Sequence, residues 1–311
     1  MRTIQYTISP QDSGKTVEQF LKGQGVSRRV ITALKKTPDG LLLGGVHTRT
    51  IDRLAAGDVL ELNLPPTPKR MPVCDIPVPV LYEDEDVLVY NKPADMPCHQ
   101  SGGHIHGTLS GVWAAHCLQT GAVTPFRAVN RLDKDTTGAV VAARNQLAAG
   151  KLWKQVSKVY LAVVAGSLPQ DTGLLDWPIE REIPYEMKRI VTPDGQRAVT
   201  QYQVLDRDPS GGCTLAAFVL HTGRTHQIRV HMAHLGHPVV GDPLYGGPQE
   251  ELTRQALHCS GVRFPQVVTG EPVTVLAPLP PDLIKLLERH HLTLDWDMVR
   301  QLLVQQEQFL I

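Results

Sequence analysis

The spacing of apolar residues divides the chain into a short N-terminal part and a longer remainder. Over residues 16–25 (TVEQFLKGQG), apolar side chains recur at helical spacing and the run ends in glycine, which predicts a helix. Ser27 is a typical N-cap residue and predicts a second helix in RRVITALKK, which follows it. After a Pro-Asp-Gly turn at residues 38–40, the apolar runs up to residue 64 predict a few short strands.

The longer remainder alternates apolar, β-branched runs with Gly and Pro turns, which predicts many strands and few helices. Residues 65–73 hold four prolines and predict an extended linker before this part. Apolar positions with a period of 3.6 predict helices within residues 281–311. The expected strands cover residues 78–84, 86–93, 139–144, 158–166, 200–205, 213–223 and 227–232.

The composition is that of an ordinary globular protein. The 311 residues suit one large domain and one small one, and 42% apolar residues allow a packed core. No apolar run reaches the roughly 18 residues of a membrane span, and the first residues lack the apolar stretch of a secretion signal. Five scattered cysteines without a C-x-x-C pair argue for a reducing compartment. We therefore expect a cytoplasmic protein that has no disulfides and binds no membrane.

Charge is distributed unevenly although the net charge is zero. Residues 1–70 hold 11 Lys and Arg against 6 Asp and Glu, whereas the rest of the chain holds 20 against 25. A small basic module on a mildly acidic body suits a protein whose module binds phosphates. Chance variation in a short segment explains the same numbers, so charge alone does not decide for a nucleic-acid partner.

The most informative stretch is RAVNRLDKDTTGAVVAAR, residues 127–144. Arg131 and Asp133 lie two positions apart, and in extended chain such residues point the same way. Gly138 follows a polar turn, so the backbone can present the carboxylate at the tip of a loop. The alternative is an ordinary surface salt bridge beside a hairpin, because R-x-D is a common pattern.

Two further stretches carry groups that suit such a carboxylate. Arg224 and Arg229 could keep a buried carboxylate charged or contact phosphates. Between and beside them, His226 and His231 are five positions apart without further ligands, so packing is favoured over zinc and no metal is expected. In KVYLA, Tyr160 either packs in a sheet, stacks on a base or takes a proton.

The segments NRLDKDTTG, KVYLAVVAG and LHTGRTHQIRVHMAHLGHPVVGDPLYG, in this order, resemble the RluA family of pseudouridine synthases. LYEDEDVLVYNKPADMP is similar to that family's opening catalytic segment, MKRIVTPDGQRAVTQYQVL to its middle section and VLAPLPPDL to its closing phrase. The resemblance spans residues 78–284. Residues 14–64 are similar to an S4-type RNA-binding domain, although this match is looser.

The resemblance implies an α+β fold. The catalytic domain is expected to contain a mixed, largely antiparallel sheet, and a small α/β S4-like domain is expected to precede it. We expect the S4-like RNA-binding domain over residues 1–64, a proline-rich linker over 65–74, the catalytic domain over 75–285 and a C-terminal helical extension over 286–311.

The chain departs from the family pattern at three positions. Asn130 replaces the first histidine of the usual H-R-L-D, and Thr137 replaces the serine of the usual T-S-G. The change at Asn130 bears on substrate more than on catalysis, because this position does not carry the reacting group. Asp95 stands where glycine is common, and aspartate tolerates a positive φ better than most residues.

The implied activity is the isomerisation of uridine to pseudouridine within folded RNA. This reaction breaks a C–N glycosidic bond, turns the base and forms a C–C bond, without oxidation and without loss of a group from the RNA. No metal or organic cofactor is therefore expected. The reaction needs an ionised carboxylate near C1′ of the ribose, which either attacks C1′ or takes the 2′ proton.

By resemblance, the essential carboxylate is Asp133, its cationic partner is Arg229 and Arg224 is a second candidate for that partner. Arg131 would fill the space that the flipped nucleotide leaves or hold that nucleotide. Tyr160 would stack on the uracil and assist loss of the C5 proton. Further substrate contacts are expected from Ile228, as an apolar wall, and from Asn130 and Thr137.

The expected partner is RNA, with ribosomal RNA preferred because an S4-like domain often accompanies this family's action on it, and transfer RNA as the alternative. A solvated helix face is the competing interpretation of the basic residues in the small domain. The sequence does not set the oligomeric state, and a monomer is the default expectation. The residues expected to contact phosphates are Lys15, Arg28, Arg29, Lys35 and Lys36.

Two rival functions remain open at this point. A non-catalytic RNA-binding protein would share the fold, but the presence of Asp133, Tyr160 and Arg229 disfavours it. A hydrolase of nucleosides or glycosides typically needs two paired carboxylates, and Asp135 is the nearby candidate for the second. Turnover and a free-base or free-sugar product would separate these alternatives.

Overall fold

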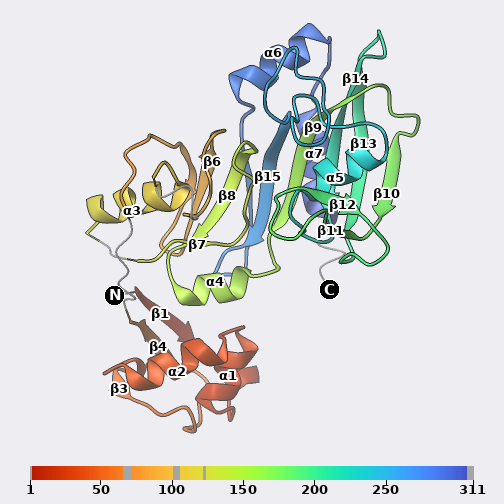
Figure 1. The fold of residues 1–311 in the computed structure, drawn as a ribbon. Helices are drawn as coiled ribbons and strands as arrows, with labels where there is room; N and C mark the ends of the chain where they lie inside the picture. The colour runs from red at the N-terminus through yellow and green to blue at the C-terminus, as the bar shows by residue number, and fades with distance from the viewer. Residues whose placement is uncertain (1, 66–71, 101–105, 122–123, 307–311) are drawn as a thin grey trace.

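The computed structural model describes residues 2–65, 72–100, 106–121 and 124–306. Most of the expected linker, residues 66–71, lies outside the described residues. The described chain forms a small N-terminal domain and a large domain, which appear one below the other in Figure 1. Among the helices of these described ranges, none combines the length and the apolar composition that crossing a bilayer requires.

The small domain contains a four-stranded antiparallel sheet and two helices, which is consistent with an S4-like domain. The side chain of Thr16 accepts a hydrogen bond from the Gln19 amide in a capping box, and Ser27 caps the second helix as expected. In sheet order, the elements are β1 (Arg2–Thr7), β4 (Val59–Leu64), β2 (Leu41–Leu43) and β3 (Val46–His47), with η1 (Pro10–Asp12), α1 (Val17–Gly23) and α2 (Arg28–Lys36).

The sequence analysis did not predict strand β1. Its apolar residues Ile4 and Tyr6 are both buried and alternate with exposed neighbours, which is the period of a half-buried strand. This strand pairs with β4 along its whole length, so the first residues of the chain are part of the fold of the small domain.

A ten-stranded mixed sheet forms the large domain, and its neighbouring strands are antiparallel except for the parallel pair β8 and β15. This arrangement confirms the expected α+β class. The strands in order are β10 (Thr172–Asp176), β13 (Val199–Arg207), β14 (Cys213–Leu220), β9 (Ser157–Ala165), β15 (Leu257–Pro265), β8 (Thr137–Ala143), β6 (Val87–Lys92) and β5 (Val80–Glu83); β16 (Pro272–Leu276) pairs with β15 and β7 (Arg127–Ala128) with β8, while β11 (Ile179–Arg181) and β12 (Arg189–Val191) form a separate pair.

Both faces of this sheet are covered. Val159 and Leu161 of β9 pack with α7 on one face, whereas Tyr160 between them belongs to the core on the other face. Ile228 and Met232 belong to that second core, so the first turns of α5 and the candidate site share the face opposite α7. The helices are α3 (Leu109–Gln119), α4 (Gln146–Leu152), α5 (Gln227–His234), α6 (Pro281–Arg289) and α7 (Trp296–Gln305).

One expectation about these elements was wrong, and one helix was not predicted. Residues 227–232, expected as a strand, form the start of α5, because Ile228 and Met232 are four positions apart and both turn inward on a helix. Helix α3 was not expected, since it is apolar on most of its surface and shows no polar face. Residues 285 and 286, between which the catalytic domain was expected to end, both lie inside α6, and α7 packs on β9.

Candidate active site

The loop between β7 and β8 presents Asp133, whose side chain is 29% exposed. At the base of the loop, the Asn130 amide bridges to β8, donating to the Ala139 carbonyl at 3.1 Å and accepting from the Val141 N–H at 2.8 Å. Gly138 has a φ of 111°, and the backbone of β15 leaves no room there for a Cβ atom. The glycine therefore lets β8 and β15 run in parallel contact directly behind the carboxylate.

A single arginine connects Asp133 with a second carboxylate. From α5, Arg229 donates its Nη1–H to Asp133 Oδ2 at 3.2 Å. Its Nε and Nη2 both bind Asp242, at 2.6 and 2.8 Å, in a two-pronged pair. Burial lowers the pKa of the Arg229 guanidinium, but the bonds and charges of Asp242 and Asp133 raise it overall. The arginine therefore remains charged beside the Asp133 carboxylate.

His226 lies on the other side of Asp133, with Nε2 at 3.8 Å from Oδ2. Its Nδ1 is 2.9 Å from the hydroxyl of Tyr245, which already accepts the Arg189 N–H at 2.9 Å. If the Tyr245 hydroxyl donates to Nδ1, the proton of the neutral ring lies on Nε2, toward Asp133, and this is the tautomer that we expect. Burial raises the pKa of Tyr245 to about 12, which keeps this phenol protonated, and burial lowers the pKa of His226.

Beneath the Asp133 loop lies a fully buried lysine. The Lys92 Nζ donates to the carbonyls of Pro93, Met96 and Lys134, all between 2.8 and 2.9 Å. Burial lowers the pKa of Lys92 to about 8. One ammonium group thus ties the turn after β6 to the loop that carries Asp133. Asp95 in this turn has a φ of 57°, as its departure from glycine suggested.

Tyr160 of β9 and Ile228 of α5 are both buried. Burial, with smaller contributions from Cys259 and Asp133, raises the pKa of Tyr160 well above its usual value. A phenolate is therefore inaccessible near neutral pH, which favours packing or stacking over proton transfer for this side chain. Arg131 lies at the exposed edge of the loop, next to Asp133.

Three residues named from the sequence are placed elsewhere. Arg224 donates to the side chain of Gln196 at 2.9 Å and to the Arg197 carbonyl, so the structure brings Arg229 and not Arg224 to Asp133. Thr137 is buried and shares a 2.8 Å hydrogen bond with His258. Asn130 is also buried, with both ends of its amide on the backbone. Each of these two side chains forms hydrogen bonds with buried polar groups of the protein.

Sequence reasoning missed Asp242, Tyr245 and Lys92. All three lie inside the segments that carried the family resemblance. Each of them contacts a residue that is distant in the sequence; Arg229 and Asp242, for example, are 13 positions apart. The spacing of neighbouring residues does not predict such contacts.

One group of possible metal ligands occurs among the described residues, formed by Asp208, Cys213 and His290. The ring nitrogens of His290 are each 2.8 Å from a carboxylate, one of Asp208 and one of Glu251. Burial lowers the pKa of His290, but its bonds to the two carboxylates raise it overall. A ring that donates from both nitrogens has no lone pair for a metal, so hydrogen bonding accounts for this group.

Comparisons with known proteins identify the family of this chain. The model of the RNA pseudouridylate synthase family matches residues 86–234, which include Asp133, Tyr160 and Arg229. The RNA pseudouridine synthase YjbO of Bacillus subtilis is 38% identical over 280 residues, which cover 88% of this chain and 98% of that protein. The ribosomal large subunit pseudouridine synthase D of Xanthomonas campestris is 40% identical over 281 residues, covering 84% of each.

A solved structure extends the agreement to the fold. The human RNA pseudouridylate synthase domain containing 4 is 26% identical, with a TM-score of 0.56 over 69% of this chain and 94% of that one. The sequence relatives span nearly the whole chain, and the structural match covers the large domain's share of it. The chain therefore belongs to the RluA family of RNA pseudouridine synthases.

Proposed function

We propose that this RNA pseudouridine synthase modifies uridines of ribosomal RNA and that Asp133 is its essential carboxylate. The observation that carries the role of Asp133 is its position: partly exposed at a loop tip, yet held by a buried arginine. The preference for ribosomal RNA is supported by the names of two relatives, the large subunit synthases D of Xanthomonas campestris and Xylella fastidiosa.

The residues around Asp133 have different roles in the proposed reaction. Arg229 places its positive charge against the carboxylate that either attacks C1′ or removes the 2′ proton. Ile228 and Tyr160 offer an apolar wall and a ring for the uracil that has left its stack. Arg131, exposed beside them, fills the vacated position in the RNA or holds the flipped nucleotide.

The small domain supplies affinity through phosphate contacts. Arg28, Arg29, Lys35 and Lys36 are exposed on α2, and none of them has an ion-pair partner within the described ranges of the chain. Lys15 instead pairs with Asp12 at 2.6 Å, so its contribution is the smallest. Deleting residues 1–70 should weaken RNA binding and flatten its dependence on salt, because fewer counterions are released.

The decisive experiment measures tritium release from RNA labelled at C5 of uridine, using total RNA from cells that lack the protein. The wild type should release tritium, Asp133→Asn should not, and Asp171→Asn, at an 81% exposed carboxylate, should match the wild type. RNA binding should survive in Asp133→Asn. Fractionating the RNA shows whether ribosomal or transfer RNA is the substrate, and tight binding without release by the wild type would contradict the assignment of Asp133.

A further inference from the structure

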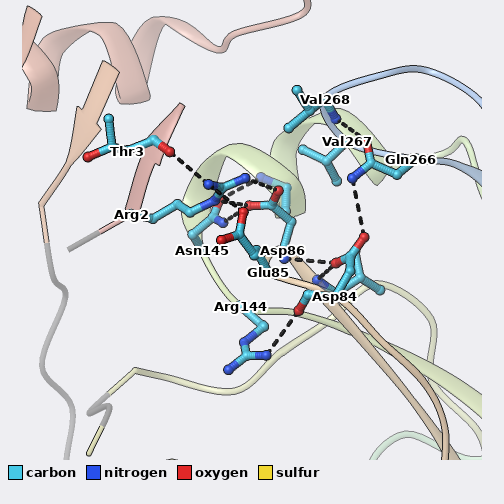
Figure 2. Close-up of polar contacts among 12 residues, drawn as sticks. Arg2, Thr3, Asp84, Glu85, Asp86, Arg144, Asn145, Gln266, Val267 and Val268 are labelled. Carbon is cyan, nitrogen blue, oxygen red and sulfur yellow. Dashed lines mark hydrogen bonds and ion pairs between the residues drawn. The ribbon is translucent and has the colours of Figure 1, made fainter. Parts of the chain in front are cut away.

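The two domains meet at an acidic run, residues 83–86, that the candidate active site does not use (Figure 2). Charge runs are usually solvated surfaces, but each acid here has a partner. Asp84 accepts the N–H groups of Asp86 and Val87, at 2.8 and 2.7 Å, which fixes the turn before β6. Glu85 and Asp86 both bind Arg2, which belongs to the first strand of the small domain.

Asp86 is the centre of this contact, and its side chain is fully buried. Arg2 donates from Nε to Oδ1 at 3.2 Å and from Nη2 to Oδ2 at 3.0 Å. Asn145 donates to the same carboxylate at 2.6 Å from the start of α4. A two-pronged arginine pair sets an angle as well as a distance, so it restricts rotation between the domains.

The arginine end of the pair is also held. Arg2 Nη1 lies 2.7 Å from Glu85 Oε2 and donates to the Thr3 carbonyl at 2.7 Å. Burial lowers the pKa of Arg2, while the bond and charge of Asp86 and the charge of Glu85 raise it overall. The donor therefore stays charged, and all three of its outer nitrogens are engaged across or beside the domain boundary.

A second anchor lies four residues further along the same strand. The Nζ of Lys151, on α4, is 3.2 Å from the hydroxyl of Tyr6 and 2.9 Å from the Val267 carbonyl. It also lies 5.6 Å from the centre of the Tyr6 ring. Four residues of strand place the two anchors roughly 13 Å apart. Two fixed points on one rigid strand prevent the pivoting that one point would allow.

The remaining contact between the domains is less directional. Apolar residues of both domains belong to one continuous core cluster, but burial of apolar surface does not set an orientation. A cavity of about 680 Å³ beside the anchors is lined by Arg2, Val30 and Leu64 of the small domain and by residues of the large one. With open space there, polar anchors rather than close packing determine the angle.

We propose that these two anchors hold the small domain as a fixed arm, which keeps α2 at one distance from Asp133. A fixed arm selects the uridine that lies at that distance from the phosphates bound by α2. Burial, with a smaller contribution from the charge of Arg29 on α2, lowers the pKa of Arg127 at the start of the strand that leads to the Asp133 loop. The selection of the uridine rests on the proposed RNA-binding role of the small domain.

Distances between spin labels test the fixed arm without RNA. Labels at Thr32→Cys on α2 and Lys285→Cys on α6 report the separation of the domains, and the five native cysteines are buried. The parent should show one narrow distance distribution, and Arg2→Met should broaden it. Arg300→Met, which breaks an exposed pair within α7, is the matched control and should leave it narrow. A broad distribution in the parent, or a narrow one in Arg2→Met, overturns the proposal.

A variant that fails to fold would give no reading, so circular dichroism precedes the labelling. Asp86→Asn keeps the shape of the side chain and removes its charge, and it serves in place of Arg2→Met if that variant is unfolded. It should broaden the distribution in the same way, and Lys151→Met should do so to a smaller extent because the first anchor remains. A narrow distribution in both Asp86→Asn and Lys151→Met also overturns the proposal.

Tritium release from total RNA of cells lacking the protein tests the consequence for substrate. Arg2→Met should raise the apparent KM about tenfold, because a loose arm lowers the effective concentration of the second contact, with a smaller effect on kcat. An unchanged KM in a variant with broadened distances overturns the selection role. If Arg28→Ala with Lys35→Ala leaves KM unchanged, the RNA-binding role of the small domain fails instead, whatever the label distances show.

Discussion

Replacing Asp242 tests whether a buried charge that never touches the substrate sustains the reaction. The Asp242 side chain has no exposed surface and receives two of the three side-chain hydrogen bonds of Arg229, while Asp133 receives the third. The variant Asp242→Asn keeps the size of the side chain but removes its charge and one strong acceptor. Arg229, only 6% exposed, then has one remaining carboxylate to balance it.

The expected loss follows from that burial. Removing one partner of a buried pair costs about 3–5 kcal/mol, since the other charge stays desolvated. Asparagine retains one acceptor oxygen, so we expect about 3 kcal/mol, the lower end of that range. Turnover should also fall about tenfold or more, because Arg229 can reorient and small displacements of a positioned group are costly in rate.

Urea unfolding and tritium release measure the two effects. The control is Asp176→Asn, which breaks a similar two-pronged pair with Arg197 in which both side chains are well exposed. Such surface pairs contribute little, so this variant should resemble the wild type in both assays. The reasoning is refuted if Asp242→Asn unfolds at the wild-type urea concentration and releases tritium at the wild-type rate.

Three further predictions concern the surroundings of the site. In the wild type, nitrogen NMR shifts should report Nε2–H on the neutral His226 ring, and shifts that report Nδ1–H would contradict this tautomer; Tyr245→Phe removes the hydroxyl beside Nδ1 and should lower turnover several-fold. Burial lowers the pKa of His258 to about 4, so this ring favours folding above pH 6.5 and its contribution is lost as the pH falls toward 4. The difference between wild type and His258→Gln in urea-measured stability should therefore change by about 3 kcal/mol across that window, and a constant difference would count against it. Asn130→Ala should destabilise the fold by about 1–3 kcal/mol, because two backbone groups lose their partner, and RNA affinity should stay unchanged. Weaker RNA binding by a variant of wild-type stability would instead indicate that Asn130 contacts the substrate.

Local signals in the sequence were sufficient for part of this structure. Apolar spacing with a terminal glycine placed α1, and the cap at Ser27 placed α2, within a residue or two, because both signals act over a few neighbouring residues. Most strands of the large sheet coincide with apolar runs between turn residues, for the same local reason. The segments bearing Asp133, Tyr160 and Arg229 were likewise recognisable as linear patterns.

Local patterns do not predict the element where a run of residues fits both the strand period and the helix period. The run at residues 227–232 alternates as a strand does, yet Ile228 and Met232 also share a helical face, and packing against the sheet decides for the helix. Helix α4, which Asn145 caps, was likewise not predicted. The residues of β1 alternate clearly between buried and exposed, but whether they form a strand depends on pairing with β4, which lies more than fifty residues later.

The sequence by itself determined the family, the order of most elements and the residues that can react. Only the tertiary structure decided which of these residues meet: Arg229 rather than Arg224 at Asp133, Asn130 inside the loop rather than against RNA, and Arg2 on Asp86. The physical reason is that a carboxylate's partner is set by burial and distance. Both are properties of chain segments brought together from far apart, and the spacing of residues along the chain does not encode them.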